Sequence, residues 1–170
     1  MSSFEGNALV RAKLKATRAL ILDVDGVMTT GAITMDDRGN ELKTFHVQDG
    51  YGVQALMQLG IRVAIMSGRR STAVEYRAKE LNITDVYQGL KDKSAGLAKF
   101  ARLHGLNYAE IAHIGDDIPD LVLFKNVGFA VAVANAVSRV KEAADLVLTR
   151  SGGDGAIREF SDLILSVQRT

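Results

Sequence analysis

The chain of 170 residues contains no cysteine, no tryptophan and a single proline. Without cysteine it can form no disulfide, no thiolate zinc site and no thiol nucleophile, which is typical of a protein of the reducing cytoplasm. No stretch approaches the roughly 18 apolar residues of a membrane-spanning helix, and residues 1–17 lack the apolar segment of a secretory signal. We therefore expect a cytoplasmic protein that has no membrane partner.

The chain also lacks an excess of positive or negative charge. The 21 lysines and arginines are balanced by 20 aspartates and glutamates, which gives a net charge of +1, and the two signs are mixed along the chain. Such a balance offers no basic surface, so we expect no nucleic-acid partner. The hydrophobic content of 47% suits one sizeable core, and we predict a single domain over residues 1–170.

Short apolar runs and longer amphipathic segments alternate along the chain. Strands are expected at 19–22, 62–66, 85–88, 111–114, 128–133 and 146–148, and helices at 51–59, 72–81, 94–104 and 136–144. A β-hairpin is expected at about 31–46, because two strand-like runs flank the turn-forming segment Asp36–Asn40; residues 150–170 are expected to form a tail. This order predicts an α/β fold, a Rossmann-like three-layer sandwich with a mainly parallel sheet.

Polar residues follow several of the expected strands. Asp23 and Asp25 follow the first, Ser67 follows the second, Lys93 comes after the third, and Asp116 follows the fourth. Because the carboxyl ends of parallel strands meet at one edge of the sheet, these side chains can share a pocket. Two carboxylates this close repel each other unless a cation lies between them, and oxygen ligands suit Mg²⁺. The pattern predicts phosphoryl transfer with Mg²⁺ as the cofactor.

These segments also carry a specific resemblance. The chain resembles the haloacid dehalogenase superfamily of phosphohydrolases, whose four motifs match Asp23–Val27, Ser67–Arg69, Lys93 and Gly115–Asp120. Lys91 also precedes the helix, but the spacing found in the family favours Lys93. The resemblance implies a phosphoric monoester hydrolase.

The resemblance assigns roles to the catalytic candidates. It implies that Asp23 is the nucleophile that forms an aspartyl phosphate, and that Asp25 protonates the leaving oxygen and then activates water. It implies that Ser67 and Lys93 hold the phosphoryl oxygens. A carboxylate beside Mg²⁺ is a competent nucleophile, and a neighbouring carboxyl group can act first as an acid and then as a base.

The same resemblance implies a magnesium site. Asp23, Asp116 and the main-chain carbonyl of Asp25 are the expected Mg²⁺ ligands. Asp117 and Asp120 are expected to support these ligands from outside the coordination shell.

Many members of the superfamily cover the site with a separate cap domain, and this sequence leaves no room for one. Residues 25–67 hold only the hairpin and one helix, and residues 93–116 hold one helix and a turn. An open site admits water, so we expect a neighbouring subunit to cover it. Members of the capless branch look like homotetramers, which makes a homotetramer the assembly that the resemblance implies.

Within the superfamily, the chain resembles the capless branch that acts on sugar acid phosphates, from about residue 18 to residue 168. The expected substrate is 3-deoxy-D-manno-octulosonate 8-phosphate, which would place the chain in lipopolysaccharide biosynthesis. The residues that match substrate contacts in this branch are Asp25, His46, Val47, Gln48, Asp49, Gly50, Gln54, Arg69, Arg77 and Lys93. The segment Gly152–Gly155 matches a glycine-rich tail that reaches an active site in this branch.

Two positions depart from the pattern of the branch. Gln48 stands where an arginine is common, and Asp154 stands where a basic residue often follows the two glycines. Both changes remove positive charge and leave a nine-carbon sugar acid phosphate (a KDN or N-acylneuraminate 9-phosphate) as the alternative substrate.

Two other classes of protein stay open. A receiver-like phosphoacceptor module also uses a strand-end aspartate with Mg²⁺ and a lysine, but it lacks an acid/base residue in the position of Asp25. The other class is a pseudoenzyme that serves as an assembly subunit. Such a protein would not need its catalytic residues, whereas every catalytic position of the family is filled in this sequence.

The chain has three histidines. His46, next to the hairpin, suits either substrate contact or packing. His104 and His113 belong to no metal-ligand cluster, so we expect them to be structural or to face solvent.

Overall fold

The computed structural model describes residues 8–168. Its centre is a six-stranded sheet in the order β5-β4-β1-β6-β7-β8, with every neighbouring pair parallel. The strands are β1 (Ala19–Leu22), β4 (Arg62–Ser67), β5 (Asp85–Gln88), β6 (Ile111–Gly115), β7 (Phe129–Ala132) and β8 (Leu146–Val147). The predicted α/β fold with a mainly parallel sheet is confirmed, and all six predicted strands are present.

Helices connect and cover the strands. They are α1 (Ala8–Ala16), α2 (Val47–Gln58), α3 (Thr72–Leu81), α4 (Lys93–His104), α5 (Leu121–Phe124), α6 (Ser138–Ala143) and α7 (Ala156–Gln168), with short helical turns at Val24–Met28, Tyr108–Glu110 and Ile118–Asp120. Helix α2 begins earlier than predicted. Helix α7 occupies the segment expected to be a tail. None of the helices in residues 8–168 is long and apolar enough to cross a membrane.

The central strand β1 shows how the three layers form. Side chains alternate along a strand, so Leu20 and Leu22 pack into the cluster formed with α1, α2, α3 and α7. Ala19 and Ile21 face the other way, into the cluster that α4 and α5 complete. All four side chains are fully buried, and burying one leucine side chain contributes about 1.5–3 kcal/mol. This buried strand is the rigid base from which the polar residues at its carboxyl end project.

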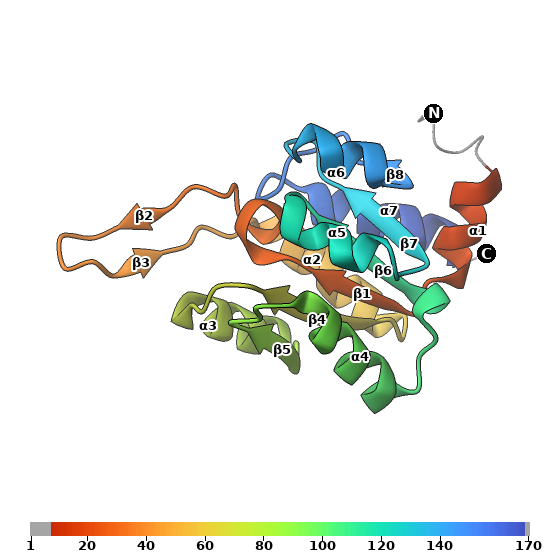
Figure 1. Ribbon diagram of the computed structural model, residues 1–170, viewed down its shortest axis with the longest axis horizontal. Helices are drawn as coiled ribbons and strands as arrows, with labels where there is room; N and C mark the ends of the chain where they lie inside the picture. Colours follow the sequence, from red (N-terminus) through yellow and green to blue (C-terminus); the bar gives the residue numbers. More distant parts are fainter. Residues whose placement is uncertain (1–7, 169–170) are drawn as a thin grey trace.

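The predicted hairpin consists of β2 (Thr34–Met35) and β3 (Glu41–Leu42), which pair antiparallel. Its turn is fixed by Asp36, which accepts main-chain hydrogen bonds from Arg38 and Asn40 at 2.9 and 2.8 Å. Figure 1 shows the hairpin projecting away from the sheet and its helices.

The hairpin carries apolar side chains that face solvent. Ile33, Met35 and Leu42 are 61%, 59% and 56% exposed. Between the turn that follows β1 and strand β4, the chain contains only this hairpin and α2, as predicted, so no cap domain is inserted there.

The glycine-rich segment before α7 packs against the turn that follows β1. The amide of Gly153 donates to the carbonyl oxygen of Val27 at 2.9 Å. The side chain of Asn135 joins the two segments, since its Nδ2 donates to the Gly26 carbonyl oxygen at 3.2 Å and its Oδ1 accepts from the Gly152 amide at 2.7 Å. A Cβ atom on Gly152 would overlap the carbonyl group of Gly26. Glycine is therefore required here by close approach of two backbones.

We expect Gly152→Ala to lower the free energy of unfolding by roughly 1–3 kcal/mol, because the added methyl group must displace the backbone of Gly26. Chemical denaturation followed by circular dichroism measures the change. Gly68→Ala is the matched control, since the nearest atom to a Cβ there is the Leu90 carbonyl oxygen at 3.6 Å. Equal stability of the two variants would contradict the packing described above.

Candidate active site

A pocket of about 230 Å³ lies at the carboxyl ends of β1, β4 and β6. It is lined by Asp23, Asp25, Ser67, Gly68, Arg69, Lys93, Asp116, Asp117, Pro119 and Asp120. The sheet thus brings together polar residues from four separate segments of the chain, including every residue that the sequence analysis named as a catalytic or magnesium-site candidate.

Asp23 is the first residue after β1, and it stays in extended conformation with φ −72° and ψ 165°. Its amide donates to the Ile114 carbonyl oxygen at 3.2 Å, which continues the β1–β6 ladder by one residue. The side chain is buried, and this burial, reinforced by the charge of Asp120, raises the pKa of Asp23 even though Lys93 opposes the shift. The carboxylate is fixed in direction and poorly hydrated.

Lys93 is the first residue of α4, which begins after Asp92 caps the helix by accepting from the Ser94 amide at 2.9 Å. The buried Nζ of Lys93 donates to Asp23 and to Asp120, each at 2.6 Å. Burial alone would lower the pKa of Lys93, but the charges of these two aspartates raise it. Lys93 is therefore a charged donor aimed at Asp23.

Asp120 is the buried acceptor that organises this side of the pocket. Its Oδ1 accepts a hydrogen bond from Nζ of Lys93 and lies 3.0 Å from Nε2 of His113. Its Oδ2 accepts hydrogen bonds from the amides of Asp116 and Asp117 at 3.0 and 3.3 Å. Burial would raise the pKa of Asp120, but the bond to His113 and the charge of Lys93 lower it below its usual range. Both oxygens of Asp120 are already used by protein donors.

His113 is fully buried in β6, and its Nδ1 lies 3.1 Å from the Ile21 carbonyl oxygen. A structural or solvent-facing histidine was expected here, and the bond to Asp120 was not predicted. A signal was available, because a histidine inside an otherwise apolar, buried strand needs polar partners. His104, in contrast, does not line this pocket. Its Nε2 lies 2.9 Å from a carboxylate oxygen of Asp85.

Asp116 faces Asp23 across the pocket. Oxygen atoms of Asp23, Asp116 and Asp120 lie within 4.8 Å of one another. Burial and the charge of Asp23 raise the pKa of Asp116 to about 7. Since the oxygens of Asp120 are occupied by donors, Asp23 and Asp116 are the two that can offer oxygen to a cation. Closely spaced carboxylates with few other counter-charges fit Mg²⁺, which prefers one or two carboxylates with water and phosphate oxygens.

Asp25 lies in the turn after Asp23, with φ −77° and ψ 110°. Both aspartates line the pocket as predicted, but their partners differ. Asp25 forms an ion pair with Lys43 from the hairpin and a longer one, at 3.5 Å, with Arg69. Lys43 was not among the residues predicted from sequence. Its contact with Asp25 joins positions 18 residues apart, so no local periodicity indicates it.

Ser67 ends β4 with a buried side chain. Its Oγ accepts from the amide of Arg69 at 3.2 Å, which fixes the tight turn that follows the strand. The turn leaves Arg69 at the mouth of the pocket with its guanidinium group partly in solvent.

The remaining substrate-binding candidates do not line this pocket. His46 to Gly50 lie at or just before the start of α2, Gln54 lies further along this helix, and Arg77 lies on α3. Val47, Gln48 and Gln54 are exposed. Arg77, from α3, donates to the His46 carbonyl oxygen at 3.4 Å and pairs with Glu80 at 2.8 Å.

Asp49 and Gly50 are buried in the first turn of α2. Asp49 accepts from the Arg158 amide at 2.8 Å and so ties α2 to the first turn of α7. Burial raises the pKa of Asp49, and its second oxygen has no hydrogen-bond partner in the described structure. A Cβ on Gly50 would meet the guanidinium group of Arg77. The structure thus gives Asp49, Gly50 and Arg77 packing contacts within the chain.

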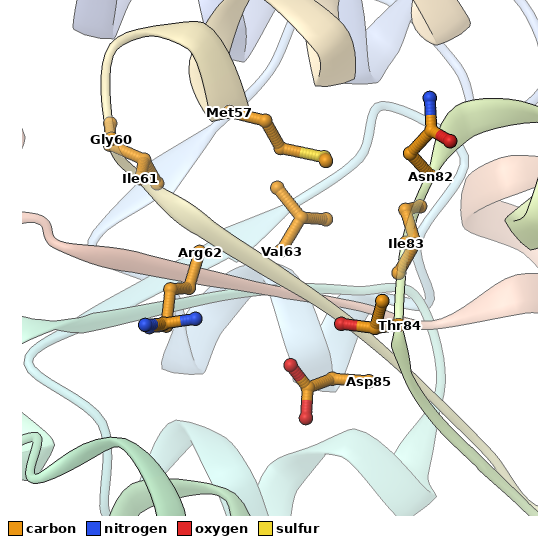
Figure 2. A pocket seen from close by; sticks show the side chains of 9 residues that line it. All are labelled: Met57, Gly60, Ile61, Arg62, Val63, Asn82, Ile83, Thr84 and Asp85. Carbon is orange, nitrogen blue, oxygen red and sulfur yellow. The ribbon is translucent and has the colours of Figure 1, made fainter.

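A second pocket, of about 300 Å³, lies at the opposite ends of the strands, where β4 and β5 begin. Figure 2 shows its lining, with Met57 and Val63 between the Gly60 turn and Asn82. Its carboxylate, Asp85, is held by His104 and by the Tyr87 hydroxyl. The reactive side chains named above gather at the other edge.

Comparison with known proteins agrees with the geometry of the carboxyl-end pocket. A family model for haloacid dehalogenase-like hydrolases matches residues 82–160. A 3-deoxy-D-manno-octulosonate 8-phosphate phosphatase of Escherichia coli (strain B / BL21-DE3) is 41% identical over 162 residues, which cover 95% of this chain and 86% of that protein. The chain belongs to this phosphatase family within the haloacid dehalogenase superfamily.

Solved structures of the family superpose closely on this one. The phosphatase of the same name from Yersinia pestis is 42% identical with a TM-score of 0.94, and the match covers 95% of this chain and 88% of that one. The enzyme of this name from Moraxella catarrhalis was solved in complex with a magnesium ion, a phosphate ion and a molecule of KDO (3-deoxy-D-manno-octulosonate). It is 41% identical with a TM-score of 0.91, and the match covers 94% of this chain and 91% of that one.

We expect Asp120→Asn to lower the free energy of unfolding by about 3–5 kcal/mol, because it leaves two buried side-chain donors without their charged acceptor. Urea denaturation measures this loss. Asp92→Asn is the control, since Asp92 is exposed and asparagine caps a helix as well as aspartate does. A variant at Asp120 as stable as this control would contradict the organising role given to Asp120.

Proposed function

We propose that the protein is a Mg²⁺-dependent phosphomonoesterase that hydrolyses 3-deoxy-D-manno-octulosonate 8-phosphate to the free sugar acid and inorganic phosphate. The observation that carries the proposal is the buried Asp23 carboxylate, held at 2.6 Å from Lys93 and facing Asp116 in the pocket. The relatives with this name and the complex with KDO support the choice of substrate.

In the proposed mechanism, Asp23 attacks phosphorus. A bond forms between its carboxylate oxygen and phosphorus while the bond from phosphorus to the sugar oxygen breaks. Asp25 gives its proton to that leaving oxygen. Asp25, now a carboxylate, then takes a proton from water, which attacks the aspartyl phosphate and releases phosphate from Asp23.

The pocket fits the expected cofactor. Asp23, Asp116 and the main-chain carbonyl of Asp25 would hold Mg²⁺, while Asp120 and Asp117 would support the loop that carries Asp116. When bound, Mg²⁺ neutralises charge on the phosphoryl group and on the nucleophile. Lys93 and Ser67 would donate to the phosphoryl oxygens, because both line the pocket beside Asp23.

The sugar acid needs recognition beyond the phosphate. Arg69 lies at the pocket mouth, and its forked donors suit the carboxylate of the substrate. We propose that His46, Val47, Gln48 and Gln54 contact the sugar from α2 and the residue that precedes it. For Asp49, Gly50 and Arg77 we propose an indirect role, since their contacts hold this turn in place.

The eight-carbon acid is preferred over the nine-carbon alternative because of the relatives. Gln48 and Asp154, the two positions that depart from the branch, are both exposed. Neither lines the pocket around Asp23. We therefore propose that they leave the chemistry unchanged, with any effect limited to substrate choice.

We expect kcat/KM for 3-deoxy-D-manno-octulosonate 8-phosphate to exceed that for nine-carbon acid phosphates and for glucose 6-phosphate by at least about 10-fold, which corresponds to roughly 1.4 kcal/mol of selective binding. Phosphate release with Mg²⁺ measures the three rates. Chelation with EDTA and the isosteric Asp23→Asn variant serve as controls, and both should abolish turnover. Preference for a nine-carbon acid would overturn the substrate, whereas no turnover together with a long-lived phosphoenzyme would favour a receiver-like module.

We also propose a homotetramer in which a neighbouring subunit covers the site. The exposed Ile33, Met35 and Leu42 on the projecting hairpin support this assembly, because an apolar, exposed strand pair favours association. A cytoplasmic location and a single functional domain remain predictions from the sequence.

Placing charges on the hairpin tests the assembly. We expect the double variant Met35→Glu, Leu42→Glu to dissociate the protein, measured by light scattering as a fall from four 18.3 kDa chains towards one. Leu103→Glu is the matched control, because Leu103 is equally exposed, at 64%, but lies on α4. A double variant with unchanged mass would exclude the hairpin as the contact between subunits.

A further inference from the structure

Four charged side chains form a closed ring between the hairpin and the pocket. Lys43 pairs with Asp25 and, at 3.3 Å, with Glu41. Arg69 pairs with the same two acids, at 3.5 Å from Asp25 and 2.5 Å from Glu41. Each cation therefore contacts both anions. Asp25 and Arg69 also line the pocket around Asp23, whereas Lys43 and Glu41 do not.

We propose that Lys43 is a positioning residue that aims the Asp25 carboxyl group at the leaving oxygen of the substrate. This inference rests on the proposed phosphatase function and adds a hairpin residue to it. Lys43 itself does not line the pocket, so it acts on the reaction through Asp25.

Asp25 needs such a tether because its backbone does not hold it in a regular ladder. It lies outside β1, in a turn that continues through Gly26 with φ +97°. Its side chain is 23% exposed, whereas that of Lys43 is only 3% exposed. An ion pair whose cation is this buried is weakly screened by solvent, so Lys43 restricts the directions that Asp25 can adopt. Lys43 and Arg69 both contact Oδ1 of Asp25, and we assign the proton that reaches the leaving oxygen to the other oxygen, Oδ2.

Arg69 is less suited to this role than Lys43. Its side chain is 43% exposed, and its short contact is with Glu41, not with Asp25. Arg69 thus remains available to a substrate carboxylate. Glu41 in turn holds both cations from the hairpin side.

The chemistry makes the role of Lys43 measurable. When the phosphoryl group is transferred from a sugar oxygen to Asp23, the leaving alkoxide is a strong base and requires the proton of Asp25. When the ester is p-nitrophenyl phosphate, the phenolate leaves without a proton. A residue that aims Asp25 should therefore matter for the first ester and hardly at all for the second.

The test compares kcat/KM of Lys43→Met for the two esters, since this parameter reports the first irreversible step, the transfer to Asp23. We expect a loss of about 100-fold with 3-deoxy-D-manno-octulosonate 8-phosphate and a much smaller loss, within about 3-fold, with p-nitrophenyl phosphate. Lys43→Arg should restore most of the lost activity. Lys99→Met, an exposed lysine over the ring of Tyr87, is the matched control and should change neither value.

Equal losses with both esters, or no loss with either, would overturn the inference. If Lys43→Met failed to fold, as judged by circular dichroism, Lys43→Gln would supply the same test, because it removes the charge that pairs with Asp25 but keeps a polar side chain at this position. Its expected signature is again a loss confined to the sugar ester, and a loss shared by both esters would count against Lys43. Wild-type protein that hydrolysed neither ester would refute the proposed function itself.

Discussion

The structure depends on holding several carboxylates close together in a partly dry pocket. Asp23, Asp116 and Asp120 lie within 4.8 Å of one another, and like charges at such distances repel strongly where water is scarce. Lys93 and His113 offset this repulsion on the inner side, by contacting Asp120 and, in the case of Lys93, Asp23 as well. Asp116 retains a raised pKa. The uncompensated side of the pocket is the side on which a divalent cation fits.

The fold places these groups with parts that are far apart in sequence. The fully buried strand β1 fixes Asp23, the first turn of α4 supplies Lys93, and β6 supplies His113. The turn after Asp23 is held from outside by Asn135 and the Gly152–Gly153 segment. The glycine-rich segment therefore serves as a packing contact within the chain, whatever further contact it makes in an assembly.

The sequence was sufficient to predict the sheet and the pocket-lining candidates, for a physical reason. Strand-end residues in a parallel sheet converge on one edge, so Asp23, Ser67 and Asp116 could be brought together from the order of the strands alone. Helix α7 also had a readable signal, because buried Ile157, Phe160 and Ile164 recur with helical spacing, but the glycines before it suggested a tail.

Other contacts could not be predicted in this way. Lys43 reaches Asp25 because it directly follows β3, where the chain returns from the projecting hairpin to the pocket, and no periodicity encodes that return. His113 was underestimated because its partner, Asp120, lies beyond the strand in a short helical turn. Such contacts depend on tertiary geometry, so spacing along the chain does not reveal them.

The covalent step at Asp23 is tested most directly by trapping its product. A single turnover with Mg²⁺ is quenched and reduced with borohydride, which converts an aspartyl phosphate to homoserine, and the peptides are then examined by mass spectrometry. The mechanism predicts homoserine at position 23 and at no other aspartate. Turnover that leaves Asp23 unmodified, or modification of Asp25 or Asp116 in its place, would contradict Asp23 as the nucleophile.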